Sequence, residues 1–155
     1  MALLAKVITV SDGVATGTRD DRSGRALVAR LTEEGYEVVD HSVSADGVDE
    51  VADALRTATA DFAGLVITTG GTGFGPRDLT PEGTRAVLER EAPGLAEATR
   101  LVNPLGRLSR ATAGTVGQAL VMNVPGSTNG ALECFGAVAD VLPHAIDLLA
   151  GRRPH

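Results

Sequence analysis

The chain is poor in the residues that define several common classes of protein. Its 155 residues include a single cysteine, Cys134, so an internal disulfide and a zinc site built on cysteines are both excluded. We expect this cysteine to pack as a small apolar residue. Tryptophan is absent and aromatic residues make up only 3%, whereas hydrophobic residues make up 43%. The core must therefore be aliphatic, which suits helices packed on a parallel sheet.

Long apolar runs, lysine and positive charge are scarce as well. No run approaches the ~18 residues that a membrane helix needs, and the first residues lack the pattern of a signal peptide, so we expect a cytoplasmic protein without a membrane partner. The formal net charge of −6 gives no electrostatic case for binding nucleic acid. Lys6 is the only lysine, which excludes a Walker loop. A dinucleotide fingerprint that started at Gly71 would need glycine where Pro76 stands, which argues against hydride transfer.

Glycine, by contrast, is abundant, and four glycines fall within the six residues 70–75. This stretch follows an apolar run at 65–67 and two threonines. A strand that ends in this way presents bare backbone N–H groups, which suit an anion such as phosphate. Arg77 and Asp78 follow, and Thr80 and Pro81 are predicted to open a helix with Thr80 as its N-cap. The stretch therefore indicates a phosphate site with charged groups beside it.

The spacing of apolar residues predicts a chain in which strands and helices alternate. We expect strands at 3–10, 36–43, around 65–67 and at 119–124. We expect helices at 23–34, 46–60, 81–90, 94–102, 129–141 and 144–149, with a loop at 16–21 and an irregular basic segment at 103–115. The alternation of strands with helices at this length predicts one domain, residues 1–155, of the α/β class, with a mostly parallel sheet and helices on both faces.

Three of the strands end in small polar or glycine-rich loops, which a parallel sheet brings to one edge. The loops are Ser11-Asp12-Gly13, residues 70–78 and Pro125-Gly126-Ser127. Carboxylates repel phosphate unless a cation lies between them. Asp12, Asp46 and Asp78 at this edge therefore suggest Mg²⁺.

Several of the candidate site residues also have an ordinary structural interpretation. Asp46 could be the N-cap of the following helix, and Asp12 could form an Asx-turn. Ser127 could cap a helix without binding any ligand. Arg110, which follows Ser109 in an irregular segment, could be a solvated arginine. The three histidines show no spacing typical of a catalytic triad or a metal site.

Five motifs mark these segments in sequence order. They are Thr9-Val10-Ser11-Asp12, Asp21-Arg22-Ser23-Gly24, Thr68-Thr69-Gly70-Gly71-Thr72-Gly73 with Arg77-Asp78-Leu79-Thr80-Pro81-Glu82, Ser109-Arg110, and Asn123-Val124-Pro125-Gly126-Ser127. Together they resemble the MoaB/Mog family of molybdenum cofactor biosynthesis over nearly the whole chain.

The resemblance implies a three-layer αβα fold, assembly into a homotrimer or hexamer, and molybdopterin adenylyltransferase activity. In that reaction ATP and molybdopterin give adenylylated molybdopterin and pyrophosphate. Asp46 and Asp78 match the two acids that bind Mg²⁺ and act in the transfer. The residues predicted to bind nucleotide and molybdopterin are Ser11, Asp12, Thr69, Gly70, Gly71, Thr72, Gly73, Ser109, Arg110, Pro125, Gly126 and Ser127. A molybdopterin-binding protein without transferase activity is the alternative, and the molybdenum insertase of the same pathway is a candidate partner.

Overall fold

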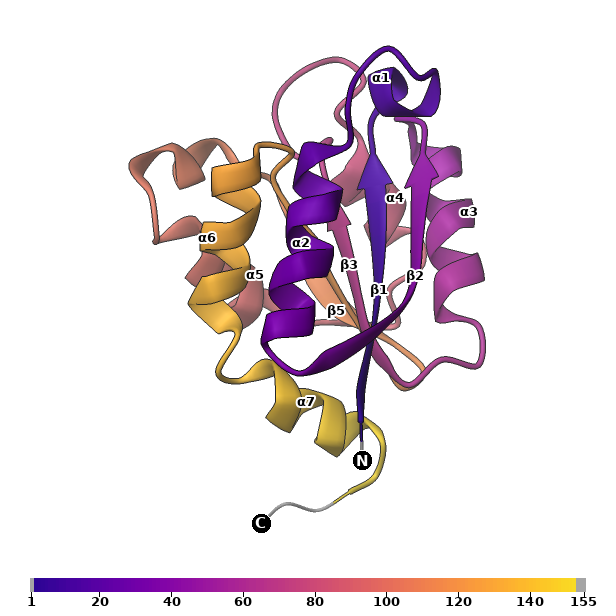
Figure 1. Ribbon diagram of the computed structural model, residues 1–155, viewed down its shortest axis with the longest axis vertical. Helices are drawn as coiled ribbons and strands as arrows, with labels where there is room; N and C mark the ends of the chain where they lie inside the picture. The colour runs from indigo at the N-terminus through magenta and orange to yellow at the C-terminus, as the bar shows by residue number, and fades with distance from the viewer. Residues whose placement is uncertain (1, 153–155) are drawn as a thin grey trace.

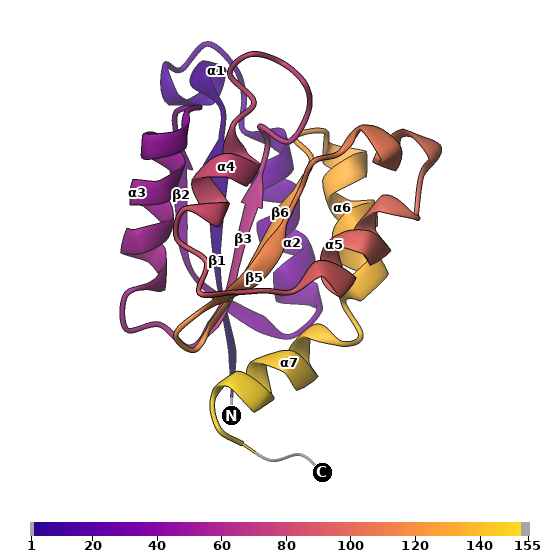
Figure 2. The ribbon, with the colours of Figure 1, turned by 180° about the vertical axis from the view of Figure 1, so that it is seen from behind.

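A six-stranded sheet lies between two layers of helices (Figures 1 and 2). The computed structural model describes residues 2–152. The strands are β1 (Leu3–Val10), β2 (Tyr36–Ser44), β3 (Gly64–Thr69), β4 (Arg90–Glu91), β5 (Ala113–Val116) and β6 (Ala119–Val124). They follow the order β2-β1-β3-β6-β5-β4. Strands β2, β1, β3 and β6 pair in parallel, β5 pairs antiparallel with β6, and β4 pairs antiparallel with β5. The predicted three-layer, mostly parallel α/β fold is confirmed.

The helices divide between the two faces of the sheet. They are α1 (Asp12–Ala15), α2 (Arg22–Glu33), α3 (Val48–Thr59), α4 (Thr80–Arg85), α5 (Pro93–Arg100), the 3-10 helix η1 (Pro104–Leu108), α6 (Thr128–Val138) and α7 (Leu142–Leu149). Helices α2, α5, α6 and α7 cover one face, and α3 and α4 cover the other (Figures 1 and 2). Among residues 2–152, no helix is both long enough and apolar enough to cross a membrane.

Each face of the sheet carries its own aliphatic core, because successive side chains of a strand point to opposite faces. Val7 and Ile67 pack towards α2 and α6, whereas Ile8 and Val66 pack towards α3. Central parallel strands covered on both sides read as continuous apolar runs, which is why their positions could be predicted. Cys134 is buried in the larger core, as expected.

The chain departs from the predicted elements on the far side of β6. The helix expected at 81–90 ends at Arg85, and β4 follows it. The segment expected to be irregular, 103–115, contains η1 and the start of β5, which forms a hairpin with β6 through Gly117 at a φ of +56°. These additional strands are two and four residues long, too short to carry a recognisable alternation.

The predicted N-cap at Thr80 is wrong. The cap position of α4 is Leu79, which makes no side-chain cap bond, and Thr80 lies within the helix. The Thr80 hydroxyl instead donates to the carbonyl oxygen of Gly70, 2.9 Å away. Thr80 therefore ties the start of α4 to the glycine loop.

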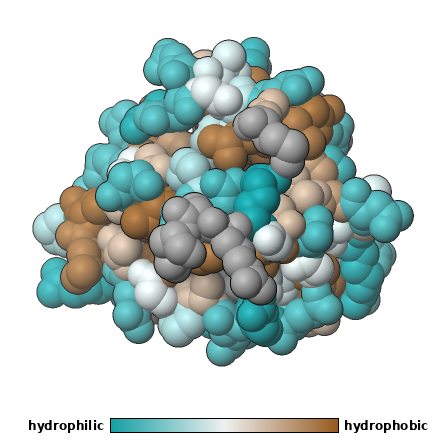
Figure 3. Space-filling model, turned by 90° about the horizontal axis from the view of Figure 1, so that it is seen from below, coloured by the Kyte–Doolittle hydropathy of each residue, from teal (hydrophilic) through white to brown (hydrophobic). Residues whose placement is uncertain are grey.

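The end of the molecule opposite the carboxyl ends of the strands is shown in Figure 3. Hydrophilic side chains there are interspersed with separate hydrophobic patches. The segments that carry Asp12, Asp46 and the glycine loop 70–78 lie at the other end, at the top of Figure 1.

Candidate functional site

Gly70 lies where the loops after β1, β3 and β6 meet. Its N–H donates to the carbonyl oxygen of Val124 over 3.1 Å. A Cβ at position 70 would lie 2.2 Å from the carbonyl oxygen of Val10, and a Cβ at position 126 would lie 3.2 Å from the Cα of Gly70. Gly70 also adopts a φ of +108°, which side chains other than glycine rarely allow. The predicted convergence of the three loops at one edge is confirmed.

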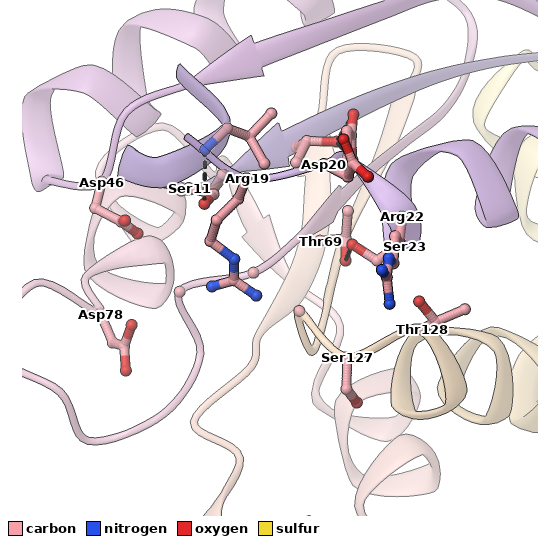
Figure 4. Close-up of a pocket in the computed structure, with 17 residues that line it drawn as sticks. Ser11, Arg19, Asp20, Arg22, Ser23, Asp46, Thr69, Asp78, Ser127 and Thr128 are labelled. Atoms are coloured by element: carbon pink, nitrogen blue, oxygen red, sulfur yellow. Dashed lines mark hydrogen bonds between the residues drawn. The ribbon is translucent and has the colours of Figure 1, made fainter. Parts of the chain in front are cut away.

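A cavity of about 580 Å³ opens at this edge, between the loops and the start of α2 (Figure 4). The predicted site residues that line it are Ser11, Asp46, Thr69, Gly70, Gly71, Asp78, Gly126 and Ser127. In Figure 4, Asp46 and Asp78 lie on one side of the cavity, and Arg22, Ser23 and Thr128 lie on the other. We call this the first cavity.

A second cavity of about 630 Å³ adjoins the first, between the glycine loop, the segment around η1 and helix α6. Four residues line both cavities: Gly71, Asp78, Gly126 and Ser127. The second cavity also includes the predicted residues Thr72, Gly73, Ser109 and Pro125. The two cavities together therefore contain every predicted site residue except Asp12 and Arg110.

Asp46 is held by a reciprocal contact with Asp12. The N–H of Asp12 donates to Oδ2 of Asp46 over 3.0 Å, and the N–H of Asp46 donates to Oδ1 of Asp12 over 3.1 Å. The helix-cap interpretation of Asp46 is wrong, because Gly47 occupies the cap position of α3. The Asx-turn interpretation of Asp12 is also wrong, since its carboxylate binds Asp46 and Arg77.

Arg77, which lies in the glycine loop, binds both Asp12 and Asp46. Its Nε and Nη2 donate to the two carboxylate oxygens of Asp12, over 2.6 and 3.1 Å, and Nη2 also donates to the carbonyl oxygen of Asp46 over 2.8 Å. The hydrogen bond from Arg77 lowers the pKa of Asp12. Burial raises the pKa of Asp46, and the nearby charges of Asp12 and Asp78 add to that increase. The arrangement places the Asp46 carboxylate near other negative charge, where a cation would be stabilised.

Asp78 is folded back against the glycine loop. Its Oδ2 accepts a hydrogen bond from the N–H of Gly75 over 2.9 Å. A Cβ at Gly73 would lie 3.1 Å from this oxygen, and a Cβ at Gly75 would lie 2.8 Å from it. The glycines therefore leave the space in which the carboxylate rests, at the junction of the two cavities.

Arg110 supports the glycine loop from outside both cavities. Its Nε donates to the carbonyl oxygen of Gly73 over 2.8 Å, its Nη1 pairs with Glu82 at 2.6 Å, and its Nη2 donates to the carbonyl oxygen of Asp78. The interpretation of Arg110 as a solvated arginine is wrong. Its contacts fix the backbone on either side of the loop.

The helix-cap interpretation of Ser127 is confirmed, and its binding of a ligand stays a prediction. Its hydroxyl accepts from the N–H of Gly130 over 3.1 Å and so caps α6, while the residue lines both cavities. Ser109 lines the second cavity, and its hydroxyl accepts from the N–H of Ala111 over 3.2 Å.

The residues that line the first cavity around the start of α2 were not predicted from the sequence. Arg19, Asp20 and Arg22 line it together with Asp21, which caps α2 and pairs with His41 at 2.8 Å. The motif around Asp21 contributes to the family resemblance, but its side chains carry no predicted role. The dense charge of residues 19–22, directly after the first strand and its loop, is the signal available in the sequence.

Within residues 2–152, no three or more His, Cys, Asp and Glu side chains gather as a group that could hold a metal ion. A carboxylate pair such as Asp46 and Asp78 suits a cation that also takes oxygen atoms from a phosphate ligand.

A glycine loop lies at the carboxyl edge of this three-layer sheet, beside two cavities that share four residues. This is the edge at which α/β proteins with parallel sheets bind their ligands. Comparison with known proteins makes the class specific. The family described as a probable molybdopterin binding domain matches residues 6–144, and the chain belongs to this family of molybdenum cofactor biosynthesis. The expected family is confirmed.

Named relatives match nearly the whole chain. A molybdopterin adenylyltransferase of Helicobacter pylori strain J99 is 34% identical over 152 residues, which cover 94% of this chain and 86% of the relative. The crystal structure of the molybdopterin biosynthesis enzyme MoaB from Thermus thermophilus is similar at a TM-score of 0.91 and 41% identity, with 97% of this chain and 98% of that chain covered. The Mog protein of Mycobacterium ulcerans is similar at a TM-score of 0.89 and 38% identity, with 98% and 99% covered.

Proposed function

We propose that this protein catalyses the Mg²⁺-dependent transfer of an adenylyl group from ATP to molybdopterin, which gives adenylylated molybdopterin and pyrophosphate. The observation that carries the proposal is the pair of cavities joined at Gly71, Asp78, Gly126 and Ser127. A transfer between two bulky substrates needs two neighbouring binding sites that bring the reacting groups of the substrates together. The names of the relatives support the same reaction.

The reaction can proceed without a protein base. The terminal phosphate of molybdopterin is already ionised at neutral pH, and one of its oxygens attacks the α-phosphorus of ATP. The bond between that phosphorus and the oxygen bridging to the β-phosphorus breaks, and pyrophosphate leaves with the electron pair. Backbone N–H groups of the glycine loop are suited to stabilise the charge of the transition state.

The donor set fits Mg²⁺. This cation takes one or two carboxylates together with waters and substrate phosphates. The carboxylates of Asp46 and Asp78 both line the first cavity, and Asp46 is held in place by Asp12 and Arg77. When bound, the cation would neutralise negative charge on the triphosphate.

We infer that the reaction takes place in the cytoplasm and that the protein acts there as a homotrimer or hexamer. We also infer that the molybdenum insertase of the same pathway receives its product. These inferences rest on the resemblance to the MoaB/Mog family.

Purified protein tests the proposed reaction when it is given ATP, Mg²⁺ and molybdopterin and assayed for pyrophosphate release. We expect release that depends on all three additions. A protein that binds molybdopterin but releases no pyrophosphate would instead be a molybdopterin-binding protein without transferase activity.

A further inference from the structure

The backbone of the segment that carries Arg19 is fixed by Gly13. The N–H groups of Thr18 and Arg19 both donate to the carbonyl oxygen of Gly13, over 2.8 and 3.1 Å, and the hydroxyl of Thr18 donates to the same oxygen over 3.2 Å. The hydroxyl of Thr16 donates to the carbonyl oxygen of Asp12 over 3.0 Å. The sequence predicts only a loop here, but these contacts give the segment a defined shape.

The stem of Arg19 occupies the space that a side chain at position 13 would fill. A Cβ on Gly13 would lie 2.7 Å from Cδ and 2.8 Å from Cγ of Arg19, and its three nearest atoms would all belong to this one side chain. From this position the guanidinium of Arg19 extends into the first cavity, between Asp46 on one side and Arg22 on the other (Figure 4). Gly13 therefore makes room for an exposed arginine to point inwards.

Arg19 and Arg22 are the only cationic side chains among the described residues that line the first cavity. The other arginines near the site are engaged elsewhere, Arg77 by Asp12 and Arg110 by Glu82. A guanidinium binds phosphate oxygens through two parallel N–H donors, which gives both affinity and orientation. The first cavity thus has an acidic side suited to a cation and a basic side suited to phosphate.

We propose that Arg19 binds the pyrophosphate portion of the nucleotide, within ATP and as the departing product, and that Gly13 positions it. The identity of the nucleotide rests on the proposed function, whereas binding of free pyrophosphate does not require catalysis. During transfer, the electron pair of the broken bond passes to the bridging oxygen of pyrophosphate. Arg19 neutralises the charge that collects there, and no proton moves.

Titration calorimetry with pyrophosphate and Mg²⁺ tests the role of Arg19. We expect Arg19→Gln to weaken pyrophosphate binding by about tenfold, the scale of one lost charge-assisted contact, and Arg19→Lys to recover part of the loss. Arg25→Gln removes an equal charge from an exposed position on α2 outside both cavities, and its affinity should match that of the wild-type protein. Equal affinities of Arg19→Gln and wild-type protein for pyrophosphate would overturn the proposal.

Molybdopterin, titrated without nucleotide, separates the two phosphate sources. Arg19→Gln should leave molybdopterin affinity nearly unchanged if Arg19 serves pyrophosphate. A loss of molybdopterin affinity as large as the loss for pyrophosphate would assign Arg19 to the phosphate of molybdopterin and overturn the proposal.

Gly13→Ala tests the positioning without removing the charge. The added methyl group displaces the flexible Arg19 stem, so we expect weaker pyrophosphate binding at an unchanged or higher melting temperature, because alanine favours helix more than glycine does. The double variant Gly13→Ala/Arg19→Gln should bind no more weakly than Arg19→Gln alone. Wild-type affinity in Gly13→Ala, or losses that add in the double variant, would refute the positioning role.

The test of pyrophosphate binding and the test of adenylyl transfer can have different outcomes. Pyrophosphate binding that depends on Arg19 in a protein without adenylyl transfer would refute the proposed function and leave the pyrophosphate site standing. Adenylyl transfer with an unaltered KM for ATP and unaltered pyrophosphate binding in Arg19→Gln would do the reverse.

Discussion

At the scale of single residues, the two acids of the site are held in different ways. Asp46 is fixed by Asp12 and Arg77, which come from the end of β1 and from the glycine loop. Asp78 is fixed by a backbone N–H of its own loop. These hydrogen bonds engage part of each carboxylate, and both Asp46 and Asp78 still line the first cavity.

The amide oxygen of asparagine can still accept the hydrogen bond from Gly75, so Asp78→Asn should keep the loop in place while it removes the charge of a carboxylate proposed to bind Mg²⁺. We expect adenylyl transfer to fall by about 10²–10³-fold, the scale seen when one electrostatic group is removed from an active site. Molybdopterin affinity, measured by titration, should change little. Equal losses of binding and turnover would assign Asp78 a structural role.

Arg77→Gln should release the Asp12 carboxylate and loosen Asp46. We expect a lower kcat and a higher Mg²⁺ concentration for half-maximal rate. The melting temperature should change little, because the side chain of Arg77 is 61% exposed and exposed ion pairs stabilise weakly. The double variant Asp12→Asn/Arg77→Gln should be no slower than the more impaired single variant, since the two act as a unit. An unchanged Mg²⁺ dependence in Arg77→Gln would show that the pair does not position Asp46.

At the scale of elements, the glycine loop is constrained differently at each position. Gly71 has a φ of +70°, and a Cβ there would lie 2.3 Å from the Thr80 hydroxyl and 3.0 Å from Oδ1 of Asp46. A Cβ at Gly73 would have its nearest contact at 3.1 Å, with Oδ2 of Asp78. The backbone conformation therefore requires glycine at position 71, whereas Gly73 leaves space for the side chain of Asp78.

Gly73→Ala should weaken ligand binding far more than it destabilises the fold, whereas Gly71→Ala should do both, with a stability loss of about 1–3 kcal/mol from the strained backbone. Gly94→Ala is the matched control, because a Cβ there meets nothing within 4 Å. Molybdopterin titration and thermal melts would measure the two effects. An unchanged dissociation constant in Gly73→Ala would argue against a phosphate site in this loop.

The elements that the sequence predicted well are those whose pattern is local. The central parallel strands β1, β3 and β6 are largely buried on both faces and therefore appear as apolar runs, and the longer amphipathic helices end within a few residues of their expected bounds. Strands β4 and β5 were missed because they are short and are stabilised by pairing with β6 and with each other. The pair of Asp12 with Arg77 joins residues distant in sequence, so no local pattern encodes it. The link between Thr80 and Gly70 and the position of Arg19 against Gly13 arise within loops, which carry no periodic pattern from which they could be predicted.

At the scale of the whole molecule, several large apolar side chains around η1 and the glycine loop are exposed. They are Phe74 at 70%, Leu101 at 85%, Leu105 at 71% and Leu108 at 54%. Hydrophobic side chains also appear as separate patches on the opposite end (Figure 3). Exposed apolar surface of this kind is typical of protein interfaces.

We expect the chain to assemble, because burial of such side chains against copies of itself would stabilise it and closed symmetry is the rule for homo-oligomers. Light scattering should give about three or six times the chain mass of 15.8 kDa. A monomer at micromolar concentration would refute the expected assembly. Loss of ligand binding in a variant forced to be monomeric would show that a neighbouring copy completes the site.

The proposed reaction passes the adenylyl group from ATP to molybdopterin in this site. The most direct measurement supplies purified protein and Mg²⁺ with molybdopterin and ATP labelled at either the α- or the γ-phosphate, and follows the label. We predict that the α-label appears in molybdopterin with one pyrophosphate released per transfer, that the γ-label appears only in pyrophosphate, and that Asp78→Asn strongly slows both. Tight molybdopterin binding with no α-label transferred at saturating ATP and Mg²⁺ would contradict the claim.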